Sequence, residues 1–168
     1  MQSHVGHVKK MLENLTKILI EKNLTISTAE SCTGGLVSSM LTDISGSSAF
    51  IKLNFVTYSN EAKHKMLGVS SNTLEKYGAV SEECAKEMAE GLMKQTNCDI
   101  SLCTTGIAGP TGGTKEKPVG LCYISCRFKN QTHIKKLRLN PNIERKEMKR
   151  LFAENAINFA YEVLSNQL

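Results

Sequence analysis

A seven-residue stretch, AESCTGG at positions 29–35, places several reactive groups between a predicted strand and a predicted helix. Its polar side chains are a carboxylate, two hydroxyls and a thiol, from Glu30, Ser31, Cys32 and Thr33. Gly34 and Gly35 permit close approach to the backbone, and free N–H groups at a helix start attract an anion or a developing oxyanion. The stretch is therefore either a catalytic turn or a turn whose hydroxyls only cap the helix.

A second stretch, TYSNEAK at positions 57–63, places a lysine in the first turn of another predicted helix. An ordinary lysine has a pKa of about 10.4 and is a poor base at neutral pH. Burial near the positive end of a helix penalises the charged form and lowers this pKa. Lys63 is therefore either a base that takes a proton from a serine or an ordinary surface lysine.

A third stretch, TTGIAGPTGGT at positions 104–114, is a loop rich in glycine. Such a loop can present backbone N–H groups to a phosphate. It does not match the P-loop pattern G-x-x-x-x-G-K-[ST], and glycine richness alone is equally typical of a plain connection.

Two nucleophiles compete in the first stretch. A Cys32 thiolate attacks well without a strong base, but its usual partner is a histidine, and only His64 is available near Lys63. Neighbouring residues on a helix point about 100° apart, so either Lys63 or His64 faces the site, but not both. We therefore favour Ser31 with Lys63 and keep Cys32 as the alternative nucleophile.

The composition is that of an ordinary globular domain. The 168 residues suit a single domain spanning positions 1–168, with 40% hydrophobic and 22% charged residues. The net charge is +5, but the basic residues are dispersed, only 5% of residues are aromatic and tryptophan is absent, which disfavours nucleic acid as a partner.

Cysteines without a C-x-x-C pair and histidines without metal spacing predict no metal site and no cofactor. Without an apolar leader or a long apolar run, we expect no membrane association and a cytoplasmic location.

Hydrophobic periodicity predicts alternating helices and strands. Strands are expected at 24–28, 51–59, 99–106, 119–128 and 132–140. Helices are expected at 4–22, 36–43, 60–68, 70–78, 82–96 and from about 142 to 163. This order favours an α/β fold with a mixed sheet and helices on both faces. If the first three strands run parallel, the three polar stretches that follow them share one edge of the sheet.

Five longer segments resemble, in order and spacing, the CinA C-terminal domain family. They are AESCTGG, TDISGSSAF, VTYSNEAKHKMLGV, YGAVSEECAKEMAEG and TTGIAGPTGGTKEKPVG, and the likeness runs from about residue 8 to 165. The resemblance implies a three-layer α/β/α sandwich with a mixed, mostly parallel sheet, often assembled as a homodimer. It also implies a nicotinamide-nucleotide amidohydrolase (NMN deamidase), a metal-independent enzyme of pyridine-nucleotide salvage that converts nicotinamide mononucleotide to nicotinate mononucleotide and ammonia.

The family motif also implies roles for individual residues. The nucleophile falls on Ser31, the base on Lys63, and Tyr58 would orient the base or donate a hydrogen bond. The expected substrate-binding positions are Glu30, Cys32, Thr33, Gly34, Gly35, Ser48, Thr105, Gly106, Gly109 and Arg145. The family usually has Gly and Asp before this arginine, where this chain has Ile143 and Glu144.

Two other kinds of function remain open from the sequence. The same loops could hold a mononucleotide without reacting with it. The family's link to competence also raises the alternative of an interaction module. Release of ammonia from nicotinamide mononucleotide distinguishes the enzyme from both.

Overall fold

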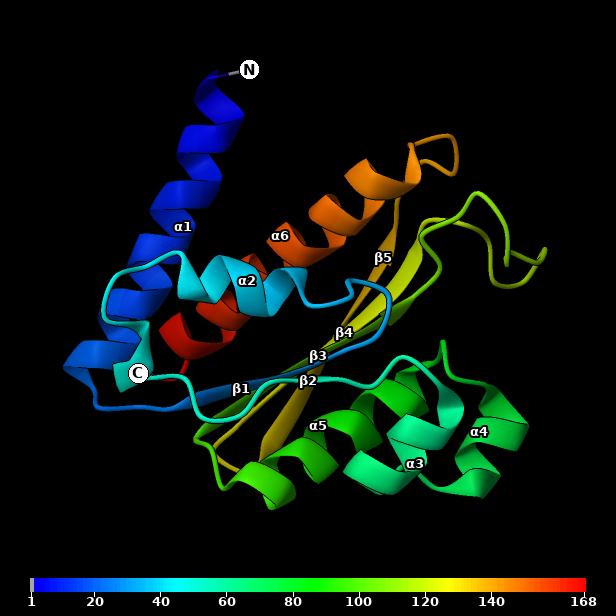
Figure 1. The fold of residues 1–168 in the computed structure, drawn as a ribbon, viewed down its shortest axis with the longest axis horizontal. Helices are drawn as coiled ribbons and strands as arrows, with labels where there is room; N and C mark the ends of the chain where they lie inside the picture. Colours follow the sequence, from blue (N-terminus) through cyan, green and yellow to red (C-terminus); the bar gives the residue numbers. More distant parts are fainter. Residues whose placement is uncertain (1) are drawn as a thin grey trace.

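The computed structural model describes residues 2–168, with side chains from His4 onward, as one sheet between two layers of helices (Figure 1). The strands are β1 (Ile26–Glu30), β2 (Phe55–Val56), β3 (Ile100–Gly106), β4 (Leu121–Phe128) and β5 (Gln131–Arg138). The helices are α1 (Gln2–Glu21), α2 (Leu36–Thr42), the short 3-10 helix η1 (Ser47–Ala49), α3 (Asn60–Leu67), α4 (Ser71–Tyr77), α5 (Glu82–Thr96) and α6 (Arg145–Ser165).

The sheet has the strand order β2-β1-β3-β4-β5. Strand β1 pairs in parallel with β2 and β3, whereas β4 runs antiparallel to both β3 and β5. Four strands therefore share one direction and only β4 opposes them, which confirms the predicted mixed, mostly parallel sheet. Strands β4 and β5 form the predicted hairpin, whose turn residues Lys129 and Asn130 both have positive φ, as a tight two-residue turn requires.

Helices cover both faces of the sheet (Figure 1). The larger core joins α1, α2 and α6 to one face and contains buried side chains such as Leu15, Leu41 and Phe152. The smaller core joins α3 and α5 to the other face through residues such as Leu67 and Met88. The three-layer α/β/α sandwich implied by the family resemblance is thus confirmed.

Local capping sets the bounds of α3, the helix that carries Lys63. The Ser59 side chain accepts a hydrogen bond from the N–H of Ala62 at its start, and Gly68 ends it with φ 70°. These are ordinary preferences for an N-cap serine and a left-handed C-cap glycine. The helix therefore begins and ends almost where the sequence predicts, and Lys63 lies in its first turn.

The predicted strand at 51–59 is wrong in its extent. Only Phe55 and Val56 pair with β1 as a strand, and Ile51 makes an isolated bridge. Between them, Asn54 Oδ1 accepts the N–H of Thr28, and Ser27 Oγ accepts the N–H of Leu53. Between Ile51 and Phe55, side chains replace main-chain groups as hydrogen-bond partners. The main-chain hydrogen bonds of this edge strand to β1 are therefore interrupted, although its residue types favour a β-strand.

Other element bounds differ by a few residues. Strand β1 extends to Glu30, two residues beyond the predicted end, because parallel pairing with β3 continues to that point. Helix α6 begins at Arg145 rather than near 142, with Glu144 as its N-cap. Across residues 2–168, no helix combines the length and hydrophobicity needed to cross a membrane.

Candidate functional site

The carboxyl ends of β1, β2 and β3 meet at one edge of the sheet, as the polar stretches following them predict. A pocket with a volume of about 200 Å³ opens there. Its walls come from the three polar stretches, the connection before α5, and the first residue of α6. The lining residues are Ser31, Cys32, Tyr58, Asn60, Lys63, Ala79, Val80, Thr105, Gly106, Ala108 and Arg145.

A buried serine and a buried lysine are in direct contact at the base of this site. Lys63 Nζ lies 3.0 Å from Ser31 Oγ. The relative exposures are only 1% for Lys63 and 8% for Ser31. Nζ also donates to two main-chain carbonyls, at 3.0 Å to Thr57 and 3.1 Å to Tyr58. The turn after β1 and the first turn of α3 thus bring together the two groups predicted to react.

The surroundings of Lys63 favour its neutral form. Burial lowers the pKa of Lys63 below its ordinary value, and the nearby thiols of Cys84 and Cys32 oppose this effect only in part. Burial also raises the pKa of Cys84 to about 11, so this thiol carries no countercharge at neutral pH. Among residues 4–168, no carboxylate forms an ion pair with Lys63.

Three oxygens lie within hydrogen-bond distance of the Lys63 amine. Nζ donates to the carbonyls of Thr57 and Tyr58 and to Ser31 Oγ, while the Ser31 hydroxyl donates to the Tyr58 carbonyl at 3.5 Å. A neutral amine has two N–H groups and one lone pair. In that form the two carbonyls can accept both N–H groups, which leaves the lone pair to take the serine proton, as a general base requires.

Backbone N–H groups near the serine are available for an oxyanion. Within the turn after β1, the N–H of Gly34 donates to the Ser31 carbonyl at 3.1 Å. The N–H groups of Cys32, Thr33 and Gly35 make no hydrogen bond within residues 4–168. Unpaired buried N–H groups are costly unless a ligand or water satisfies them. Of these three residues, Cys32 lines the pocket, so its N–H group is the one available to a substrate oxygen.

Glu30 supports the turn from behind and does not contact Lys63. Its carboxylate accepts the Thr33 hydroxyl at 2.6 Å and the N–H groups of Val37 and Ser38 at 2.8 and 3.0 Å. It thereby caps α2, whose N-cap residue Gly35 has no capping side chain of its own. Glu30 and Thr33 hold the shape of the turn, and neither lines the pocket.

Tyr58 contacts Lys63 through its main chain, whereas its side chain faces an arginine. The phenol oxygen accepts a hydrogen bond from Arg145 at 3.2 Å. The same guanidinium donates to the carbonyl of Gly109 at 2.6 Å, which ties α6 to the glycine-rich loop. Tyr58 and Arg145 therefore form one wall of the pocket.

Thr105 shapes the pocket from the side of β3. Its hydroxyl donates to the carbonyl of Ala79 at 2.8 Å. This bond holds the Ala79–Val80 segment against the pocket, while Gly106 follows at the end of the strand. The contribution of Thr105 is thus to fix an apolar wall.

Ser48 is not brought to this pocket. It is exposed on η1, shortly before Phe50, whose carbonyl accepts the N–H of Ile26. This hydrogen bond places Phe50 beside the first residue of β1, whereas Ser31 comes directly after the last residue of β1. A five-residue strand separates the two positions by roughly 16 Å along the sheet.

Several lining residues were not singled out from the sequence. Four of them lie within the five segments that resemble the family, so those segments could have indicated them: Asn60, Ala79, Val80 and Ala108. Lys149 does not line the pocket but lies near the turn after β1, since a Cβ atom placed on Gly34 would be 3.4 Å from its Nζ. Lys149 follows Arg145 by one helical turn on α6, so i,i+4 spacing on the closing helix could have indicated it.

Neither of the two rival groups makes a hydrogen bond to Ser31 or Lys63. Cys32 Sγ contacts Cys122 Sγ at 3.8 Å and packs into the larger core. The His64 ring bonds the Val69 carbonyl through Nδ1 at 2.8 Å. Lys63 therefore contacts Ser31 rather than Cys32, and His64 takes no part in the pocket.

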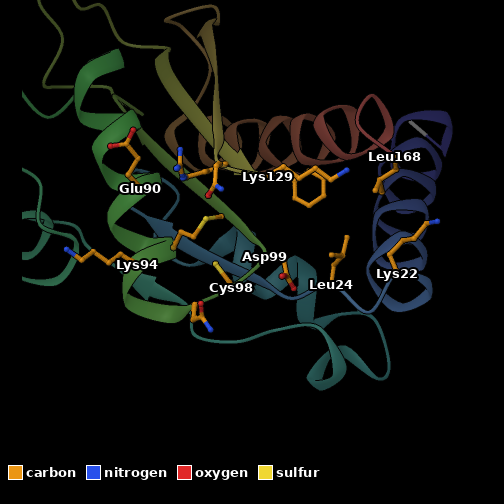
Figure 2. A pocket seen from close by; sticks show the side chains of 13 residues that line it. Lys22, Leu24, Glu90, Lys94, Cys98, Asp99, Lys129 and Leu168 are labelled. Atoms are coloured by element: carbon orange, nitrogen blue, oxygen red, sulfur yellow. The ribbon is translucent and has the colours of Figure 1, made fainter.

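A larger hollow lies at the opposite edge of the sheet (Figure 2). Its volume is about 870 Å³, and charged side chains including Lys22, Glu90, Lys94 and Lys129 surround it. Its one thiol, Cys98, has a pKa raised by burial, and Asp99 is bonded to Thr25. We assign the chemistry to the smaller pocket because it holds the serine–lysine pair. Among residues 4–168, no three His, Cys, Asp or Glu side chains gather as metal ligands.

Comparison with known proteins identifies the family. Residues 8–164 match the model of the CinA C-terminal domain. The chain is 53% identical over 132 residues to a protein of Thermoanaerobacter pseudethanolicus, covering 79% of this chain and 32% of that protein. It is 56% identical over 129 residues to a protein of Acetivibrio thermocellus, covering 77% and 31%. Both are named as competence-damage inducible proteins, a name that states no reaction.

Solved structures of the same superfamily have the same fold. A CinA superfamily protein from Klebsiella pneumoniae aligns with a TM-score of 0.89 and 30% identity, covering 95% of this chain and 98% of that one. A competence/damage inducible protein from Agrobacterium tumefaciens aligns with a TM-score of 0.83 and 40% identity, covering 89% and 92%. This chain therefore belongs to the CinA C-terminal domain family. It spans about a third of the length of the curated relatives it matches.

Proposed function

We propose that this CinA-family domain is a metal-independent serine amidohydrolase that removes ammonia from the carboxamide of nicotinamide mononucleotide. The observation that carries the proposal is the contact between Ser31 Oγ and a buried, unpaired Lys63 Nζ at 3.0 Å. Maintaining an uncompensated lysine in a protein interior is costly, so such a group is typical of a functional site. The reaction itself comes from the family resemblance.

In the first step, neutral Lys63 removes the proton of Ser31 and the serine oxygen attacks the carboxamide carbon. The carbonyl oxygen becomes an oxyanion, and the unpaired N–H group of Cys32, a pocket-lining residue next to Ser31, is the donor that we expect to stabilise it. Each donor that meets such an oxyanion contributes about 3 to 4 kcal/mol to the transition state. The turn after β1 therefore supplies both the nucleophile and its electrostatic support.

In the second step, the Lys63 ammonium returns its proton to the departing nitrogen, and ammonia leaves. The C–N bond breaks as the acyl-enzyme ester with Ser31 forms. A water molecule then attacks this ester, with Lys63 again taking a proton. Nicotinate mononucleotide is released and Ser31 regains its hydrogen. The carbonyls of Thr57 and Tyr58 hold the lysine amine in place throughout.

The size of the pocket indicates which part of the substrate enters it. A volume of about 200 Å³ is below the roughly 300–1,000 Å³ of pockets that enclose a drug-sized ligand. We infer that the pyridine ring and its carboxamide enter between Ser31 and the Ala79–Val80 wall. The ribose phosphate then lies outside, towards Arg145 and Lys149, whose cations form no ion pair within residues 4–168.

The test is ammonia release from nicotinamide mononucleotide by purified protein in the presence of a metal chelator. We expect stoichiometric ammonia and nicotinate mononucleotide from the unaltered protein, and none above background from Ser31→Ala. Binding measured in parallel distinguishes the rival functions. Tight binding of the mononucleotide without ammonia indicates a nucleotide-binding module, and neither binding nor ammonia indicates an interaction module or a different substrate.

A further inference from the structure

A pair of cysteines lies directly behind the proposed nucleophile. Cys32 follows Ser31 in the chain and lines the pocket, and Cys122 lies on β4. Their sulfur atoms are 3.8 Å apart. Among residues 4–168, this is the one sulfur–sulfur contact between cysteines, although all six cysteines are buried and free. The proposed amidase mechanism uses neither thiol.

We propose that Cys32 and Cys122 form an oxidation site, in which a peroxide converts the pair to a disulfide that disables Ser31. The disulfide itself depends only on the cysteine geometry, whereas the loss of activity rests on the proposed function. Cytosolic disulfides of this kind are usually transient and redox-sensing rather than structural.

The two thiols differ in access to an oxidant. Cys32 lines the pocket at 6% relative exposure, so a molecule as small as hydrogen peroxide can reach it, whereas Cys122 is fully buried behind it. Burial holds the pKa of Cys122 well above its ordinary value, and its contact with Cys32 adds to this effect. Cys122 therefore stays protonated and can donate its S–H towards Cys32. Cys32 is the thiol that reacts first, and Cys122 is the one that resolves it.

The chemistry balances with hydrogen peroxide as the only co-reactant. The Cys32 sulfur attacks one peroxide oxygen, the O–O bond breaks, and the sulfur becomes a sulfenic acid, while the leaving hydroxide takes the Cys32 proton as water. The Cys122 sulfur then attacks the Cys32 sulfur, forming the S–S bond and breaking the S–O bond. The leaving hydroxide takes the Cys122 proton as water. Two thiols and one peroxide thus give one disulfide and two waters.

Formation of the disulfide must move the catalytic turn. The sulfur atoms have to approach by about 1.7 Å to reach bonding distance. Cys122 lies within a strand that is paired on both sides, whereas Cys32 lies in a turn in which the N–H groups of Cys32, Thr33 and Gly35 are unpaired, so the turn moves more easily. Because Ser31 is the adjacent residue, its hydroxyl leaves the 3.0 Å contact with Lys63.

A neighbouring cysteine provides a matched control. Cys126 lies four residues after Cys122 on the same face of β4 and is equally buried, but within residues 4–168 it makes no hydrogen bond to another sulfur. Cys122→Ala and Cys126→Ala therefore leave cavities of the same kind in the sheet. Only the first removes the partner of Cys32.

The experiment treats the intact protein with hydrogen peroxide in the absence of reductant. Peptide mapping locates disulfides, and ammonia release is measured before oxidation, after it and after dithiothreitol. We expect a Cys32–Cys122 crosslink in the unaltered protein and in Cys126→Ala, with a mass loss of about 2 Da for two hydrogens. Activity should fall on the order of tenfold or more and return with dithiothreitol, while Cys122→Ala forms no crosslink.

Each outcome separates the two proposals. If oxidised protein contains no Cys32–Cys122 crosslink, or if Cys122→Ala loses activity as reversibly as the unaltered protein, the oxidation site is refuted while the amidase remains. If the crosslink forms but the reduced protein releases no ammonia, the oxidation site stands and the proposed function fails. If the crosslinked protein is fully active, the effect of the disulfide on Ser31 is refuted.

Discussion

Lys63 Nζ and Ser31 Oγ lie 3.0 Å apart although 32 positions separate the residues in the chain. The contact exists because β1 and β2 run in parallel and end at the same edge of the sheet. It is also isolated from compensating charge, since no carboxylate among residues 4–168 pairs with the amine. The following predictions depend on this relationship or on the elements that maintain it.

The first prediction concerns the identity of the nucleophile. Ser31→Ala should lower kcat for ammonia release by about 10³-fold or more, because within residues 4–168 no other hydroxyl bonds the amine. Cys32→Ala should have a smaller effect, on the order of tenfold or less, since its sulfur faces Cys122. Steady-state kinetics and thermal unfolding of both variants are the measurements. A Ser31→Ala enzyme with normal kcat would rule out the serine mechanism.

The second prediction concerns the pH dependence of activity. Because burial lowers the pKa of Lys63 and the base must be neutral, kcat/KM should rise with pH and reach its plateau below the ordinary lysine pKa of 10.5. A pH–rate profile from pH 5 to about 11.5, extending past the ordinary lysine pKa, measures this. An increase that continues without a plateau beyond that value would show that the lysine is not depressed.

The lowered pKa of Lys63 also predicts how the stability of the fold changes with pH. Between the folded-state pKa of Lys63 and its ordinary value of 10.5, the unfolded chain binds more protons, so this group makes stability rise with pH. Lys63→Met removes the effect. We therefore compare the free energy of unfolding of the variant with that of the unaltered protein. The difference, variant minus unaltered protein, should be larger at neutral pH than near pH 10. Urea unfolding at both pH values tests this, and a difference of the opposite sign contradicts it.

The third prediction concerns the phosphate of the substrate. Arg145→Gln and Lys149→Gln should each raise KM for nicotinamide mononucleotide on the order of tenfold, since a lost charged contact is worth about 1.5 kcal/mol or more. Neither should change turnover of the riboside that lacks the phosphate. Lys146→Gln is the control, because this exposed lysine points about 100° away from Arg145 on α6. Equal effects on both substrates would place the phosphate elsewhere.

The fourth prediction concerns the buried carboxylate of Glu30. Glu30→Ala should lower the free energy of unfolding by about 3 kcal/mol, because it leaves the N–H groups of Val37 and Ser38 unpaired. Denaturant unfolding measures the change. Glu61→Ala, on the exposed side of α3, should change stability by less than about 0.5 kcal/mol. A Glu30 variant as stable as the Glu61 variant would refute the capping role.

The fifth prediction concerns the packing of α3 against α5. A Cβ atom on Gly91 would collide with the carbonyl of Leu67, the last residue of α3. Gly91→Ala should therefore destabilise the protein by about 1–3 kcal/mol and shift the helix that carries Lys63, lowering activity as well. Gly6→Ala on α1, where a Cβ meets nothing, should instead stabilise by about 0.5–1 kcal/mol. Similar effects at the two glycines would contradict this account.

Much of the site could be recognised in the sequence because its residues cluster in short local segments. The stretches containing Ser31, Lys63 and Thr105 each follow a predicted strand, and strand direction alone places such segments at one edge. The end of α3 was likewise predicted, since a glycine such as Gly68 stops a helix within a residue or two of itself. These features depend on short-range preferences and on motif order, both of which can be read along a chain.

Only the tertiary structure decided what each side chain contacts. Glu30 could have bonded Lys63 or capped a helix, and it caps α2. Tyr58 meets Arg145, Cys32 meets Cys122, and Ser48 lies at the far edge of the sheet. These partners come from distant parts of the chain, and rotamers, burial and strand register select among them. A sequence indicates which groups are available, but distance and desolvation, which set their reactivity, arise only when the sheet and helices pack.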